Sequence, residues 1–170
     1  VSSTALLYLY LQSQGADVQY YIPDRLTEGY GMNLDAVRKI KERDVKLIIT
    51  VDNGISSILE AEKIKALGME LVVTDHHRPG TTLPDAVAVV DPYREEFDGV
   101  FNEWAGVGVA FKLIQALAKD QSVESLLKLY ADLICLGTVA DISPLVDENR
   151  IMVTEGLKMF KDTKKVGLKA

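Results

Sequence analysis

The chain has 170 residues, 48% of them hydrophobic, which is enough for one compact domain with a buried core. Its single cysteine, Cys135, lies in an apolar run, so a disulfide framework is excluded, core packing accounts for the residue and a reducing compartment is expected. The net charge of −6 argues against a broad basic surface for nucleic acid, although a carboxylate cluster built for divalent cations would give the same sign.

The predicted elements alternate along the first half of the chain. Apolar residues at helical spacing predict helices over residues 2–14, 34–43 and 56–67, and Gly15 and Gly68 follow the first and third of these. Aliphatic, β-branched runs predict strands over residues 18–22, 45–51, 70–73 and 86–90, with a loop over residues 23–33.

The second half, from about Trp104, is predicted to be helical, over residues 107–117, 123–136 and 150–160. Strands that alternate with helices through short connections predict an α/β fold. We therefore expect a doubly wound, mainly parallel sheet with helices on both faces and a helical C-terminal part. No apolar run reaches the roughly 18 residues that span a bilayer, so we expect a soluble cytoplasmic protein with no membrane contact.

Acidic side chains follow three of the predicted strands. Asp52, Asp75 and Asp91 each come directly after a buried run, and ligands in open α/β sheets bind beyond the carboxyl ends of the strands. The two histidines of the chain, His76 and His77, come next to Asp75. Imidazole together with carboxylate suits Mn, Co or Zn, but a surface turn with adjacent polar residues is the alternative for an arbitrary Asp-His-His.

Two further segments have both a binding and a structural interpretation. Asn53 and Gly54 precede a predicted helix whose N-terminus can bind phosphate, and an ordinary N-capped turn is the alternative. Gly106 and Gly108 can equally cradle a phosphate or permit close helix packing. Asp141 can be a ligand or a helix cap.

Residues 51–57 (VDNGISS), 74–77 (TDHH) and 137–141 (GTVAD) resemble, in order and spacing, the second, third and fourth motifs of the DHH phosphoesterases. Residues 23–25 with 28–31, 105–113, and 143–145 leading to 148–150 are similar to the RecJ branch of that superfamily. The resemblance covers essentially the whole chain. It implies the DHH catalytic domain of a 5′–3′ exonuclease specific for single-stranded DNA, active in DNA repair and recombination.

The resemblance also implies roles for individual residues. Asp52 would bridge two Mn²⁺ or Mg²⁺ ions, His76 and Asp141 would ligate one of them, His77 would contact metal or the scissile phosphate, and Asp75 would orient the histidines. Substrate contacts are expected from Asn53, Gly54, Arg25, Gly106, Gly108 and Arg150. Either arginine can instead be a structural ion-pair partner.

The family pattern extends beyond both ends of these 170 residues. A first motif with two acidic ligands would end immediately before Val1, and a DHH-associated domain that closes the cleft would follow the chain. We expect these residues alone to be inactive or nearly so. Single-strand binding protein and a helicase are expected partners of the complete enzyme.

Three other functions are compatible with parts of this pattern. One is another DHH phosphoesterase, such as an oligoribonuclease, a cyclic-dinucleotide phosphodiesterase or a pyrophosphatase. A second is a catalytically silent DHH scaffold in a replication assembly. The third is a nucleotide-binding domain of the flavodoxin or Rossmann kind, which the absence of a glycine-rich fingerprint disfavours.

Overall fold

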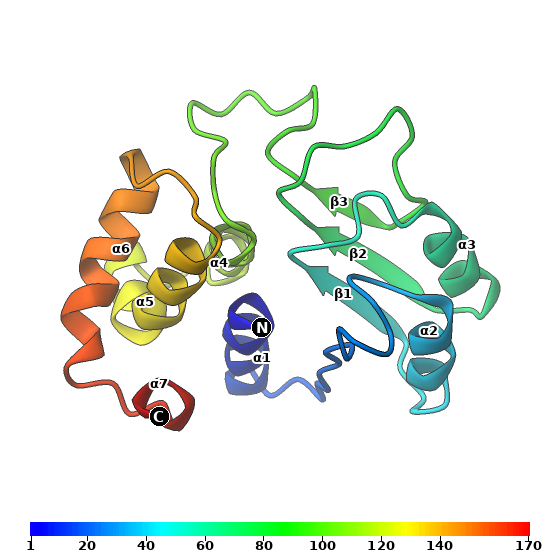
Figure 1. Cartoon of the computed structure of the whole chain (residues 1–170), viewed down its shortest axis with the longest axis horizontal. Coiled ribbons are helices and arrows are strands. Elements are labelled where there is room, and N and C mark those ends of the chain that lie inside the picture. The colour runs from blue at the N-terminus through cyan, green and yellow to red at the C-terminus, as the bar shows by residue number, and fades with distance from the viewer. The chain divides into compact units, whose positions relative to one another are not determined.

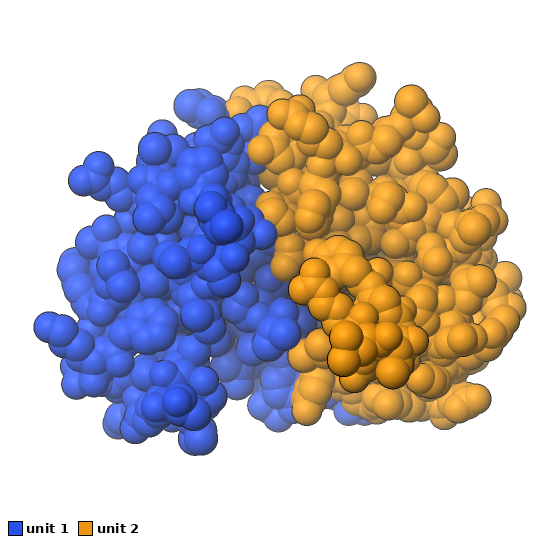
Figure 2. Space-filling model, viewed as in Figure 1, with its two compact units in different colours: residues 1–18, 100–170 blue, residues 19–99 orange.

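Figure 1 shows a computed structural model of residues 1–170, which contains three strands and seven helices. The elements are α1 (Ser2–Ser13), α2 (Leu34–Lys41), β1 (Leu47–Val51), α3 (Ile58–Ala66), β2 (Glu70–Thr74), β3 (Ala88–Val90), α4 (Gly106–Leu117), α5 (Val123–Ala140), α6 (Asp147–Phe160) and α7 (Val166–Lys169). They form two compact units (Figure 2): unit 1 comprises residues 1–18 and 100–170, and unit 2 comprises residues 19–99. The α/β class, the parallel sheet and the helical C-terminal part are confirmed.

Unit 2 contains a parallel sheet of order β1-β2-β3. Helices α2 and α3 lie on the same side of it (Figure 1), and their buried side chains pack with those of β2 in one hydrophobic cluster. Leu71 and Val73 face this cluster because alternate residues of a strand point to the same face. The cluster consists of Val37, Ala61, Ile64, Met69, Leu71 and Val73.

The register of this sheet aligns the three strand ends. Val51 pairs with Thr74, and Thr74 pairs with Val90. The next residue of each strand is an aspartate, so Asp52, Asp75 and Asp91 lie side by side at the carboxyl edge. This edge is where open α/β sheets bind ligands.

Unit 1 is helical. Helix α1 packs against α4 and α5, and α5 packs against α6, with Leu6, Phe111 and Ile134 fully buried among them. Cys135 is buried in α5, which confirms its interpretation as core packing. No helix of the chain combines the length and apolarity needed to span a membrane.

One element predicted from the sequence was wrong, and one helix was predicted to end too early. Residues 18–22 form no strand, because their β-prone side chains have no neighbouring strand to pair with, and Tyr20 is exposed. Helix α5 continues to Ala140 rather than ending at residue 136. Gly137 lies within this helix, and because a Cβ there would collide with Ser2 and Val107, the glycine permits close helix packing.

The remaining boundaries differ by a few residues, as expected at element ends. Helix α6 begins at Asp147, three residues before the predicted start at residue 150, and α7 was not predicted. The single-domain prediction for residues 1–170 stays a prediction.

Candidate metal centre

Asp52, directly after β1, has φ +65°, a left-handed conformation that is costly for most residues and is best tolerated by Gly, Asn and Asp. Its backbone N–H donates to Thr74 O at 3.0 Å, and its carbonyl accepts the Tyr30 hydroxyl at 3.1 Å. These bonds hold the strained residue at the end of the strand. Backbone strain of this kind concentrates at functional sites.

Gly54 is required by the same turn. Its φ is +110°, and a Cβ there would lie 2.8 Å from Thr50 Oγ1. The turn places Ile55 N–H against the next strand, where it donates to Asp75 Oδ2 at 3.0 Å. Asn53 closes the turn by donating from Nδ2 to Val51 O at 2.9 Å.

Asp75 organises the Asp-His-His segment. Its side chain is 1% exposed, and Oδ1 accepts the backbone N–H of His76 at 2.8 Å and of His77 at 3.3 Å. The same oxygen accepts His77 Nδ1–H at 2.7 Å. Because an ionised carboxylate only accepts, this bond places the proton of neutral His77 on Nδ1 and leaves the lone pair on Nε2.

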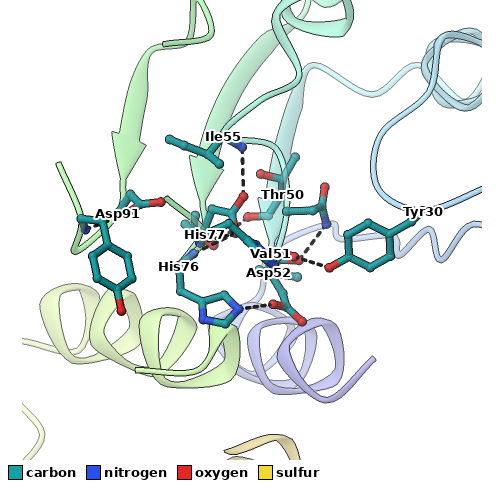
Figure 3. Close-up of polar contacts among 12 residues, drawn as sticks. Tyr30, Thr50, Val51, Asp52, Ile55, His76, His77 and Asp91 are labelled. Carbon is teal, nitrogen blue, oxygen red and sulfur yellow. Dashed lines mark hydrogen bonds and ion pairs between the residues drawn. The ribbon is translucent and has the colours of Figure 1, made fainter. Parts of the chain in front are cut away.

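His76 points toward the end of β1 (Figure 3), where its Nε2 lies 3.0 Å from Asp52 Oδ1. The His76 and His77 rings are tilted against each other with centroids 4.5 Å apart. One ligand atom from each of Asp52, Asp75, His76 and His77 lies within 4.8 Å of every other. Asp52, His76 and His77 are a suitable mixed oxygen and nitrogen donor set for a first-row divalent metal, with the Asp75 carboxylate behind them as the acceptor that orients the segment.

Two further residues lie beside this group: Tyr30, which the sequence did not indicate as a site residue, and Asp91, which was recognised at a strand end but given no role. The Tyr30 ring meets His77 edge to face, with centroids 6.5 Å apart, in addition to its bond to Asp52. Asp91 is 6% exposed, and its Oδ1 accepts Tyr93 N–H at 2.8 Å, whereas Oδ2 has no partner. Burial raises the pKa of the Asp91 carboxyl to about 6, and the charge of Asp75 adds to this effect.

The loop that contains Tyr30 is anchored through Glu28. The Glu28 carboxylate accepts the Tyr21 hydroxyl at 2.6 Å, Lys39 Nζ at 2.7 Å and Asp24 N–H at 2.9 Å. These donors, Lys39 first, lower the pKa of Glu28 to about 2. Next to them, the Arg25 guanidinium lies over the Tyr30 ring at 5.8 Å from its centroid.

The other predicted site residues belong to unit 1. Asp141 is the C-cap of α5 and accepts the Ser143 hydroxyl at 2.7 Å, and Arg150 lies exposed on α6. Gly106 and Gly108 are buried in the first turn of α4, where a Cβ on Gly108 would lie 2.9 Å from Trp104 Cβ. The roles predicted for these four residues stay predictions.

Residues 1–138 match the family model described as "DHH family, N-terminal domain". The chain is similar to the single-stranded-DNA-specific exonuclease RecJ of Bacillus subtilis (strain 168), with 48% identity over 169 residues that cover 99% of this chain and 21% of the relative. It is also similar to RecJ of Escherichia coli (strain K12), with 40% identity over 182 residues, 99% of this chain and 31% of the relative. The chain therefore spans between about a fifth and a third of these curated relatives.

Two solved structures resemble the chain over 99% of its length. One is exonuclease RecJ bound to manganese, with a TM-score of 0.87, 40% identity and 42% of that chain covered. The other is RecJ from Thermus thermophilus in complex with Mn²⁺, with a TM-score of 0.80, 36% identity and 24% of that chain covered.

Proposed function

Because this chain belongs to the DHH family, we propose that it supplies part of a two-metal site that hydrolyses phosphodiester bonds. We propose further that the complete protein is a 5′–3′ exonuclease for single-stranded DNA. The similarity to RecJ relatives at 48% and 40% identity supports this choice over other phosphoesterases of the family.

The observation that supports the proposal most directly is the convergence of Asp52, Asp75, His76 and His77 at one sheet edge. Mn²⁺ is the ion we propose, because both similar solved structures are manganese complexes and the donors are mixed nitrogen and oxygen. When bound, the ions would polarise a phosphoryl oxygen and lower the pKa of a water molecule.

We propose a different role for each side chain of this site. Asp52 and His76, whose ligand atoms face each other at 3.0 Å, would hold the metal. The buried Asp75 carboxylate fixes the backbone of His76 and the ring of His77 through its hydrogen bonds. His77 is 49% exposed, and its Nε2 is available to a metal or to the scissile phosphate.

Substrate contacts are proposed for residues around this edge. Asn53 and Gly54 form the turn after β1, and Arg25 lies over Tyr30, so a phosphate can meet both backbone N–H groups and a guanidinium. Asp141 is proposed as a further metal ligand, and Gly106, Gly108 and Arg150 as contacts to the nucleic acid.

The test is Mn²⁺-dependent degradation of 5′-phosphorylated single-stranded DNA by the complete protein, with EDTA as the metal-free control. In the variant Asp52→Asn the backbone is preserved, because Asn also tolerates the left-handed conformation. We expect it to lose activity by at least about 100-fold. Asp35→Asn, an exposed carboxylate of α2 paired with Arg38, is the matched control.

Wild-type activity in Asp52→Asn would contradict the proposal. Preference for dinucleotides over long single strands would instead favour an oligoribonuclease-like or cyclic-dinucleotide activity. Assaying residues 1–170 alone tests the expectation that they are inactive without further ligands, and robust turnover would refute it.

We also propose a cytoplasmic location, with single-strand binding protein and a helicase as partners. The support is the DNA substrate in the names of the relatives. Co-purification of the tagged complete protein from cells is the measurement for the partners.

A further inference from the structure

A second arginine–tyrosine pair lies at the carboxyl edge of the sheet in unit 2. Arg78 directly follows His77, and its guanidinium lies over the Tyr93 ring, 4.8 Å from the centroid. Tyr93 belongs to the segment after β3, and its N–H is held by the buried Asp91 carboxylate at 2.8 Å. The stacking partner is thus itself anchored to the site.

The charge of Arg78 is not neutralised within the protein. Arg78 is exposed, and none of the ion pairs of the chain involves it, whereas Arg38 and Arg94 are paired with Asp35 and Glu96. Stacking occupies a face of the guanidinium and leaves its N–H groups at the edge. An arginine held in this way is preorganised to bind a phosphate through two parallel hydrogen bonds.

Arg78 lies next to the candidate metal centre, because it is the residue that follows His77. Its Cα is about 3.8 Å from that of His77, as for any consecutive residues. The Tyr30 ring also contacts the His77 imidazole, and the Arg25 guanidinium lies 5.8 Å from the Tyr30 centroid. Two arginine–tyrosine pairs are therefore connected to His77: Arg25–Tyr30 through the contact of the Tyr30 ring, and Arg78–Tyr93 because Arg78 is the next residue of the chain.

We propose that Arg78, stacked on Tyr93, binds a backbone phosphate of the DNA strand beside the phosphate that is cleaved. The inference rests on the proposed nuclease function and adds a substrate-positioning residue to it. Its contribution is to binding and alignment of the strand, and the metal ligands are unaffected by it.

The experiment uses the complete protein, Mn²⁺ and 5′-phosphorylated oligo(dT). For Arg78→Gln we expect the KM to rise about tenfold, the cost of a charged hydrogen bond, with kcat nearly unchanged. The salt dependence of kcat/KM should weaken by about 0.7 in log–log slope, the value for one phosphate contact on a single strand. Arg78→Lys should keep this slope but restore the KM only in part.

Arg43→Gln is the matched control. Arg43 is also exposed and also lies over a tyrosine, Tyr21, at 5.9 Å, but it precedes β1 and so belongs to the amino end of that strand. We expect its KM to equal that of the wild type. Equal losses in Arg43→Gln and Arg78→Gln would mean a nonspecific charge effect and would overturn the proposal.

Substitution of single phosphates by uncharged methylphosphonates identifies the contact. At one position beside the scissile bond, the wild type should lose about as much as Arg78→Gln loses on normal DNA, and the variant should lose nothing more there. If the wild type and Arg78→Gln lose the same activity at every methylphosphonate position, the inference is overturned. Weaker Mn²⁺ binding by Arg78→Gln in calorimetry overturns it as well. A wild type that degrades no single-stranded DNA refutes the proposed function instead.

Discussion

His77 donates its Nδ1–H to Asp75 Oδ1 across 2.7 Å, and the accepting carboxylate is almost completely buried. Asp75 also accepts three backbone N–H groups, from Ile55, His76 and His77. One buried side chain therefore fixes the turn after β1, the course of the segment after β2 and the ring of His77. This arrangement makes Asp75 a positioning residue of the candidate site.

Asp75→Asn is expected to reduce Mn²⁺-dependent activity by about 10- to 100-fold, because an amide replaces an acceptor that orients His77. The amide also places a donor where the carboxylate accepts four N–H groups, so the free energy of unfolding should fall by about 1–3 kcal/mol. Nuclease assays and urea denaturation measure the two effects. Asp35→Asn should change neither, and an active Asp75→Asn would remove the orienting role.

Gly54→Ala tests the turn between Asp52 and Asp75. The new Cβ would meet Thr50 Oγ1 at 2.8 Å in a residue with φ +110°, so we expect a loss of about 2–4 kcal/mol in unfolding free energy. Gly29→Ala is the control, since Gly29 has φ +83° but a Cβ added there would have nothing within 4 Å. It should cost only about 1 kcal/mol. Similar losses in both variants would show that steric contact with Thr50 is unimportant.

The sequence was informative wherever a local pattern determines the structure. Buried parallel strands are aliphatic on both faces, so residues 47–51 and 70–74 were recognisable, and the parallel arrangement predicts that Asp52 and Asp75 lie at one edge. Residues 18–22 have similar β propensity but no pairing partner, and pairing depends on the rest of the fold.

The neighbours of the candidate site depend on tertiary structure in the same way. Tyr30 reaches Asp52 across 22 positions of sequence, and no periodicity predicts such a contact. The sequence did not show that Gly137 permits close helix packing. Whether a glycine ends a helix or lets another helix approach depends on the residues that lie opposite it.

Gly156→Ala tests the close packing of α5 and α6. A Cβ at Gly156 would collide with Ala131 O and Cys135 Cβ, and Ala131 C would lie at 2.9 Å. Backbone atoms cannot rotate away, so we expect a loss of about 1–3 kcal/mol in unfolding free energy. Gly167→Ala, in α7 with nothing within 4 Å, should instead be neutral or stabilise by up to about 1 kcal/mol. Thermal and urea denaturation distinguish the two, and a stable Gly156→Ala would contradict the packing.

Asp91→Asn is expected to stabilise the protein in EDTA at pH 8. Burial, with the charge of Asp75, raises the Asp91 pKa from 3.8 to about 6. A carboxyl with a raised folded-state pKa favours folding when protonated, and this advantage is lost as pH rises from about 4 through 6. At pH 8 the buried charge therefore costs stability, on the order of 3 kcal/mol.

Asn at position 91 removes this charge and keeps an oxygen for Tyr93 N–H. The gain of the variant over the wild type should be about 3 kcal/mol at pH 8 and vanish near pH 4, where both side chains are neutral in the folded protein. Denaturation midpoints measured between pH 4 and pH 8 follow the difference directly. A stability difference that does not change between pH 4 and pH 8 would mean that burial does not raise the pKa of the Asp91 carboxyl.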